Sequence, residues 1–274
     1  MAGSRGSSGL RGGPGVAGPD PGLFGPGSVA WKVHADPSAL VGGLRALLLQ
    51  ALHPLAMAAV DQHSDYRSDP WGRLGRTTEY LLTVTYGARE AAEGAGAHVR
   101  EVHAAVRGVD PTTGKRYEAD DPELLAWVHN VMVDSLLLAY MRFGGLLSAE
   151  EADRYVVEMH RAAELVGLRG ATLPSSVPAL RAWLGGVEGL QVTHAARVGL
   201  ALVLVPPMPL ALRPLWAVPV TAALSLLPPE VRAMYGLPWL AGADPAVRLA
   251  ALTLGTVVKA IRPTPPALAA AEAR

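Results

Sequence analysis

Apolar residues recur with a helical spacing along most of this chain of 274 residues. Few segments alternate apolar and polar positions as a half-buried strand does, and runs of β-branched residues are short. No internal repeat and no glycine-rich phosphate loop interrupts this pattern. The sequence therefore predicts an all-α fold, a single domain of about eight to ten helices.

Asp-Pro pairs predict three helix starts, because Asp caps free amide groups and Pro is favoured at the first helical position. Ser148 and Glu151 have the spacing of a capping box, and Gly87 has the position of a helix stop. Pro54 must bend or restart the first helix, since proline removes an amide donor. The three Asp-Pro pairs that predict these starts are those at Asp36, Asp69 and Asp121; further helices are expected at 89–107 and after Ser176, Pro228 and Asp244.

The composition of the two ends differs from that of the middle of the chain. Residues 1–21 are rich in Gly, Ser and Pro and cannot bury enough apolar surface to fold, so we expect them to be disordered. Residues 22–262 form the predicted helical domain, and residues 263–274 a flexible tail. The start lacks the continuous apolar segment of a signal peptide, which favours a cytoplasmic location.

One segment, residues 199–229, is apolar enough to resemble a membrane span. Several prolines interrupt it and Arg213 lies at its centre, whereas a spanning helix usually needs about 20 uninterrupted apolar residues. We expect a buried or partly exposed apolar element, and peripheral association with a membrane stays open.

Composition excludes several classes of function. Lys+Arg and Asp+Glu both number 24, so the formal net charge is zero, and no basic cluster is present. This balance argues against a nucleic-acid partner, because phosphate contacts need a surplus of cations. Without cysteine, disulfides, iron–sulfur clusters and thiol nucleophiles are excluded, and a metal would need His, Asp, Glu, Met or Tyr.

Arg73, Arg76 and Thr77 are spaced to share one helix face. Two guanidinium groups and a hydroxyl that converge on one point would bind a carboxylate or a phosphate. The alternative from spacing alone is a solvated face with ordinary ion pairs.

Three histidines lie in apolar helical segments: His53, His103 and His129. His103 shares a predicted helix face with Arg100 and Arg107. It is either a metal ligand or a core or surface residue whose ring nitrogens are hydrogen-bonded within the protein. His129 lies in a helix that is apolar nearly all round, which implies burial and either a structural or a distal catalytic role. His53 either bonds the backbone groups freed by Pro54 or lines a distal pocket with Gln50.

Motifs of other enzymes are absent from the sequence. It contains no HExxH zinc motif, no GxSxG nucleophile elbow and no Glu-x-x-His pair of a di-iron bundle. A facial triad of His53, His63 and Asp65 holding non-haem iron stays open.

Several segments in order resemble the MpaB-like oxygenases, the family that includes rubber oxygenase (latex-clearing protein). The similar segments span roughly residues 26–239. They are PGSVAWKVHADPSALVGGLRALLLQALHP, HSDYRSDPWGRLGRTTEYLLTVTYG, VREVHAAVRG, YEADDPELLAWVHNVMVDS, LSAEEADRY and LPPEVRAMYGLPW.

The resemblance implies a globin-like helical fold that holds haem b, with an axial histidine, and dioxygen-dependent chemistry. By motif match His103 is the iron ligand, and Arg73, Arg76 and Thr77, with Arg107 nearby, bind the cofactor. Arg76 stands where rubber oxygenase has Lys, and the proposed catalytic glutamate of that enzyme has no counterpart here.

The leading hypothesis is thus a haem b-dependent oxygenase of a hydrophobic small molecule, with His53, Arg73 and His129 as catalytic residues. Rubber is not the expected substrate, given the start of the chain. The alternatives are a non-haem iron oxygenase on the same fold and a non-enzymatic haem or lipid carrier. The chemistry could equally be that of a dioxygenase, a monooxygenase or a peroxidase-like enzyme.

Overall fold

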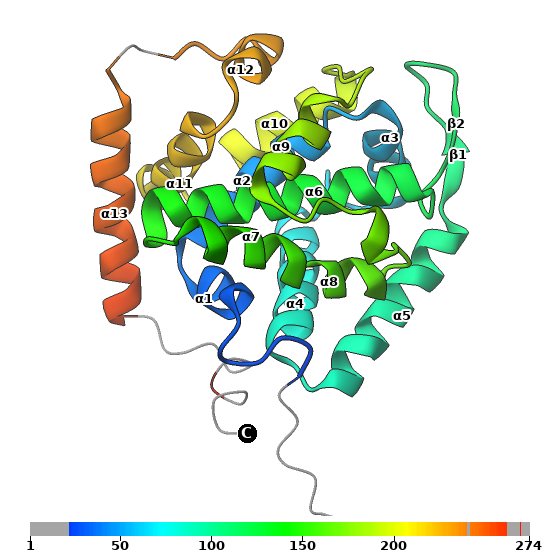
Figure 1. Ribbon diagram of the computed structural model, residues 1–274. Coiled ribbons are helices and arrows are strands. Elements are labelled where there is room, and N and C mark those ends of the chain that lie inside the picture. Colours follow the sequence, from blue (N-terminus) through cyan, green and yellow to red (C-terminus); the bar gives the residue numbers. More distant parts are fainter. Residues whose placement is uncertain (1–21, 240–241, 262–268, 270–274) are drawn as a thin grey trace, which may run out of the picture.

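The computed structural model describes residues 22–239, 242–261 and 269, and these residues are mainly helical (Figure 1). The all-α prediction is confirmed; the described chain adds one antiparallel pair of short strands. Residues 1–21 and 263–274, predicted to be flexible ends, lie outside the described residues apart from Ala269.

Helix labels within the described residues run from α1 to α13, more than the predicted eight to ten. Two differences add helices: α1 precedes the predicted first start at Asp36, and a break at Met159 separates α7 from α8. The bounds are α1 Val29–Ala35, α2 Ser38–Gln50, α3 Pro54–His63, α4 Pro70–Tyr86, α5 Arg89–Ala105, β1 Arg107–Val109, β2 Arg116–Glu118, α6 Pro122–Ala139, α7 Ala149–Glu158, α8 His160–Leu165, α9 Val177–Gly185, α10 His194–Leu204, α11 Arg213–Ser225, α12 Pro229–Tyr235 and α13 Asp244–Ile261. Short helical turns lie at η1 Tyr140–Gly144, η2 Gly170–Thr172 and η3 Leu210–Leu212.

Local capping explains the helix starts that the sequence predicts. The Asp69 carboxylate accepts from the backbone N of Gly72 (2.9 Å) and Asp121 from Glu123 N (2.8 Å), each directly before a proline. Ser148 and Glu151 form the predicted capping box, and α4 ends at the predicted Gly87. These bonds satisfy amides at the helix ends that have no partner within the helix.

Helices α2 and α6 pack closely at the centre of the fold, where α6 crosses the middle of the molecule (Figure 1). Gly42 permits this approach: a Cβ added there would lie 2.8 Å from Leu136 Cα. Close by, Arg45 Nη1 lies 2.8 Å from the Asp134 carboxylate, and both side chains are buried. Asp134 thus pairs across the helix interface and not with His129 on its own helix.

The end of α5 differs from the prediction. The helix stops at Ala105 and not near Arg107, because residues 107–109 pair with 116–118 as a β-hairpin. Asp110 holds the turn by accepting from the backbone N of Thr112 and Thr113. Arg107 therefore lies on a strand and does not share a helix face with His103.

The apolar segment 199–229 folds as α10, η3 and α11, which are separated by prolines. One helix among the described residues is long and apolar enough to cross a membrane, Pro122–Gly144, and 67% of its most apolar window is buried inside the protein. That burial is typical of a core helix in a water-soluble fold, so the finding is weak support for a span.

Candidate functional site

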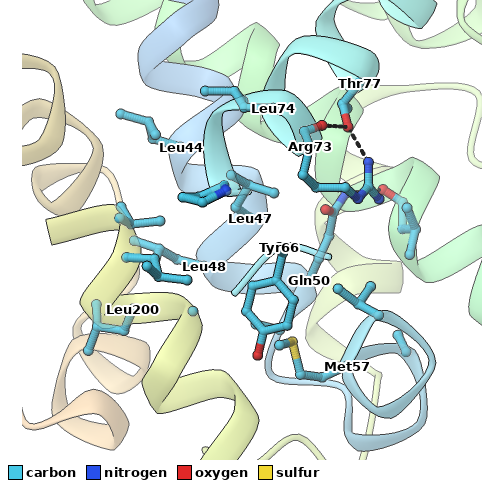
Figure 2. Close-up of a pocket in the computed structure, with 18 of the residues that line it drawn as sticks. Leu44, Leu47, Leu48, Gln50, Met57, Tyr66, Arg73, Leu74, Thr77 and Leu200 are labelled. Carbon is cyan, nitrogen blue, oxygen red and sulfur yellow. Dashed lines mark hydrogen bonds between the residues drawn. The ribbon is translucent and has the colours of Figure 1, made fainter. Parts of the chain in front are cut away.

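A cavity of about 300 Å³ lies between α2, α3, α4 and α10, and its walls are mainly apolar (Figure 2). Leu44, Leu47 and Leu48 of α2 form one wall, and Leu200 of α10 another. Leu47 and Trp71 are 41% and 39% exposed, so the cavity opens to solvent beside them. Its volume is at the low end of the range for small-molecule sites, roughly 300–1,000 Å³.

The bend at Pro54 shapes this cavity. Helices α2 and α3 meet there at 105°, and both line the cavity, α3 through Ala56, Met57 and Val60. Proline lacks the amide that would continue α2, so the chain turns and restarts. The predicted break in the first helix is thus confirmed, and it separates two helices that face the same space.

Arg73 brings a positive charge into the cavity from α4. Its guanidinium donates to the Thr77 hydroxyl one turn along, as Figure 2 shows, and it forms no ion pair with any described residue. Burial lowers the pKa of Arg73, the nearby charge of Arg76 lowers it further, and the charge of Asp65 raises it. A half-buried cation without a carboxylate partner is suited to binding an anionic group of a ligand.

His103 lines the same cavity from α5, which packs against α4. Its Nδ1 atom is buried and has no hydrogen-bond partner among the described residues. Burial lowers the pKa of His103, the Asp120 carboxylate raises it, and the charge of Arg73 lowers it. The imidazole is therefore neutral near pH 7, the state in which a ring nitrogen can bind a metal.

Arg76 and Arg107, two further predicted cofactor-binding residues, lie away from the cavity lining. Arg76 pairs with Asp65 and, at 3.5 Å, with Asp69, and its side chain is 53% exposed. Arg107 is exposed on β1, and its Nη1 lies 2.9 Å from Asp120 and 3.0 Å from Glu118. Of the predicted arginine cluster, the structure thus brings only Arg73 together with Thr77 and His103.

His53 and His129, predicted as catalytic, also lie outside the cavity lining. His53 caps α3, since its Nδ1 accepts from the backbone N of Ala56 at 3.5 Å. His129 is 6% exposed in α6, and burial with the nearby His160 lowers its pKa to about 3. His53 therefore bonds an amide at the start of α3 and not the backbone carbonyl that Pro54 was expected to free, and His129 is buried as its apolar helix predicted.

Tyr66, two tryptophans and Gln50 complete the cavity, and of these the sequence singled out only Gln50. Tyr66 follows α3 and donates to Asp61 Oδ1 at 2.7 Å; burial raises its pKa to about 12. Trp71 and Trp216 pack edge to face with ring centroids 5.3 Å apart. Gln50, expected as a distal group beside His53, lines the cavity, but its amide donates to Val128 O at 2.8 Å.

The facial triad of His53, His63 and Asp65 is not assembled. In the described part of the chain, no three His, Cys, Asp or Glu side chains are grouped closely enough to hold a metal ion. His63 instead packs against the ring of Tyr117, with centroids 6.3 Å apart. A site with one protein ligand, such as the axial position of a porphyrin, does not need such a group.

Comparison with known proteins identifies the family. Residues 31–256 match the family described as ER-bound oxygenase mpaB/B'/Rubber oxygenase, catalytic domain. No curated protein and no solved structure matches the chain, so the globin-like likeness stays a prediction. The match includes α2 to α12 and therefore every cavity-lining residue described above. The chain belongs to this family of oxygenase catalytic domains and is an oxidoreductase.

Proposed function

We propose that this oxygenase uses haem b, with His103 as the axial ligand of the iron, and acts on a hydrophobic small molecule. The observation that carries the proposal is the buried Nδ1 of His103, which has no described partner in a cavity that also holds the unpaired cation of Arg73. Buried polar atoms in proteins are normally hydrogen-bonded, so an orphaned imidazole nitrogen beside a cavity points to a missing ligand.

The donor set fits a haem in three respects. His103 supplies one neutral imidazole, Arg73 with Thr77 supplies a receptor for a propionate, and the apolar walls match the face of a porphyrin. When bound, the haem would supply the redox chemistry that activates dioxygen, and the protein would tune it through the axial ligand and the polarity of the pocket.

The residues of this chain have separable tasks. Burial lowers the pKa of His103 and keeps its ring neutral, so one ring nitrogen would be free to bind a metal. The Arg73 guanidinium, already oriented by Thr77, anchors one acidic group and fixes the ligand in the cavity. Leu44, Leu48 and Val203 are buried in the wall and exclude water from the space beside the ligand.

The substrate is inferred from the same walls. Besides Arg73 and His103, the polar side chains that line the cavity are Gln50, Tyr66 and Thr77, and the rest of the lining is mostly aliphatic or aromatic. Such a pocket binds apolar molecules through burial of their surface. The predicted partners are therefore a hydrophobic substrate and dioxygen. Haem contacts of Arg76 and Arg107 and catalytic roles of His53 and His129 stay predictions.

Absorbance spectroscopy tests the cofactor and its ligand together. The purified protein should show a Soret band that shifts with dithionite, and a His103→Ala variant should lose it. His98→Ala is the matched control, because His98 is exposed on the same helix α5 and should leave the band unchanged. Full haem retention by His103→Ala would overturn the axial assignment. Bound iron without porphyrin absorbance would favour the non-haem alternative.

A further inference from the structure

An exposed apolar surface lies beside the mouth of the cavity, where the chain passes from α10 to α11. Residues 209–215 are all exposed, and the large side chains include Leu210 at 73% and Leu215 at 55% exposure. We define the portal surface as Val205, Leu210, Leu212 and Leu215, each of them about half exposed or more. Large apolar patches on a protein surface mark contacts with other molecules.

This surface adjoins the cavity at one residue of the same segment, Pro206. Pro206 is buried and lines the cavity, while its neighbour Val205 is 56% exposed. The Trp71 indole, which lies at the opening, donates to Pro207 O at 2.7 Å and ties the start of α4 to this segment. Pro206 therefore borders the cavity, whereas Val205 and residues 209–215 lie open to solvent.

The aromatic residues at the mouth are of the kind that prefers a membrane interface. Trp71 and Trp216 form an edge-to-face pair, and both indole N–H groups are satisfied by backbone carbonyls, Trp216 by Val203 O at 2.9 Å. Indole rings with an apolar body and a polar N–H are enriched at the level of lipid headgroups.

The charges within this stretch of the chain favour an anionic partner. No Asp or Glu stands between Glu188 and Glu230, whereas Arg197 and Arg213 are exposed in this stretch. Neither arginine forms an ion pair with a described residue. Exposed leucines flanked by free arginines have the composition of an element that lies in a membrane interface.

We propose that the portal surface docks onto a bilayer that contains anionic phospholipid, with its leucines at the acyl boundary and Arg213 at the headgroups. The segment lies on the membrane and does not cross it, since α10 and α11 have only 11 and 13 residues and prolines separate them. An apolar substrate dissolved in the bilayer then enters the cavity past Trp71 and Trp216. This last step rests on the proposed function, whereas the bilayer contact does not.

Vesicle flotation tests the contact directly. The full chain should float with phosphatidylcholine vesicles, and more strongly when phosphatidylserine is included. Leu210→Glu and Leu215→Glu should each lower the partition coefficient roughly tenfold, because an apolar side chain would no longer be buried. Arg213→Gln should lower only the part that depends on phosphatidylserine, by roughly fivefold.

The control is Leu146→Glu, which changes a leucine that is 92% exposed after η1, outside the portal surface, and should leave flotation unchanged. Absence of flotation, or an equal loss in Leu146→Glu, would overturn the proposal. So would a concentration-dependent dimer that Leu210→Glu abolishes, because a second copy would then cover the surface. His103→Ala should float like the unaltered chain. The proposal of haem binding and the proposal of bilayer binding can therefore be disproved separately.

Discussion

Arg73 and His103 line one cavity from two neighbouring helices, and the positive charge of Arg73 is one of the causes that lower the pKa of His103. The two side chains therefore act on each other before any ligand binds. Arg73 holds a charge where burial disfavours it, and His103 keeps a neutral ring beside that charge. This combination is typical of a functional site, where groups that are costly to bury lie together in a cavity.

The first prediction concerns the titration of His103. Arg73→Gln should raise the pKa of His103, because a neighbouring cation no longer opposes protonation of the ring. Asp120→Asn should lower it, since the Asp120 carboxylate favours the protonated form. NMR titration of the histidine Cε1–H signals of the haem-free protein measures both shifts. An equal pKa of His103 in the unaltered protein and in both variants would show that neither Arg73 nor Asp120 influences its titration.

The second prediction separates Arg73 from Arg76, which lie one turn apart on α4. Arg73→Gln should weaken haem binding roughly tenfold to a hundredfold, the typical loss when one charge-assisted hydrogen bond is removed. Arg76→Gln should leave haem affinity nearly unchanged, because its guanidinium pairs with Asp65 and Asp69 outside the cavity lining. Haem titration followed by absorbance measures the haem affinity of each variant. An equal loss of affinity in both variants would mean that Arg76 also binds the anionic group of the ligand.

The third prediction concerns the pH dependence of stability. Burial lowers the pKa of His34 to about 4 and that of His129 to about 3, from an ordinary value of 6.5. Between pH 6.5 and 4 the unfolded chain binds protons that the folded chain does not, so stability falls as the pH falls. At about pH 5 each histidine should lower the free energy of unfolding by about 2 kcal/mol relative to neutral pH.

Urea unfolding at neutral pH and at about pH 5 measures this loss. His129→Leu should flatten the pH dependence, because it removes a group that takes up a proton only on unfolding. His98→Ala, which changes an exposed histidine, should keep the dependence of the unaltered chain. If His129→Leu is as sensitive to acid as the unaltered chain, His129 is not the source of the effect.

The fourth prediction concerns the buried ion pair of α2 and α6. Asp134→Asn should lower the free energy of unfolding by about 3–5 kcal/mol, since Arg45 would keep a buried charge without its partner. The melting temperature should then fall by about 10 °C. Lys32→Gln is the control: its pair with Glu151 is exposed, and its loss should cost less than about 1 kcal/mol. Similar melting temperatures for both variants would show that the buried pair contributes no more than a surface one.

What the sequence predicts well is local. Asp69, Asp121 and Ser148 cap their helices through bonds to amides two or three residues away, so spacing alone is sufficient. The bend at Pro54 follows in the same way from one missing amide.

What the sequence could not predict depends on partners distant along the chain. Spacing placed Arg73 and Arg76 on one helix face, but Asp65 and Asp69 in the preceding loop draw Arg76 away from the cavity. Thr85 and Tyr155 likewise bond both ring nitrogens of His34, at 2.8 and 2.9 Å, although they lie 51 and 121 residues away along the chain. The resemblance to the family predicts His103 as the iron ligand, but only the packed structure shows that its Nδ1 has no hydrogen-bond partner among the described residues.

The last prediction tests the close approach of α2 to α6, which brings the cavity-lining leucines of α2 into place. Gly42→Ala should lower the free energy of unfolding by about 1–3 kcal/mol, because its Cβ would lie 2.8 Å from Leu136 Cα and 2.9 Å from Ser135 O. Gly43→Ala is a matched control in the same helix, since a Cβ there meets nothing within 4 Å. Alanine favours the helix over glycine, so Gly43→Ala should stabilise the fold by up to about 1 kcal/mol. Opposite signs in chemical denaturation would establish the tight contact, whereas stabilisation by both variants would mean that α2 and α6 lie farther apart than this structure shows.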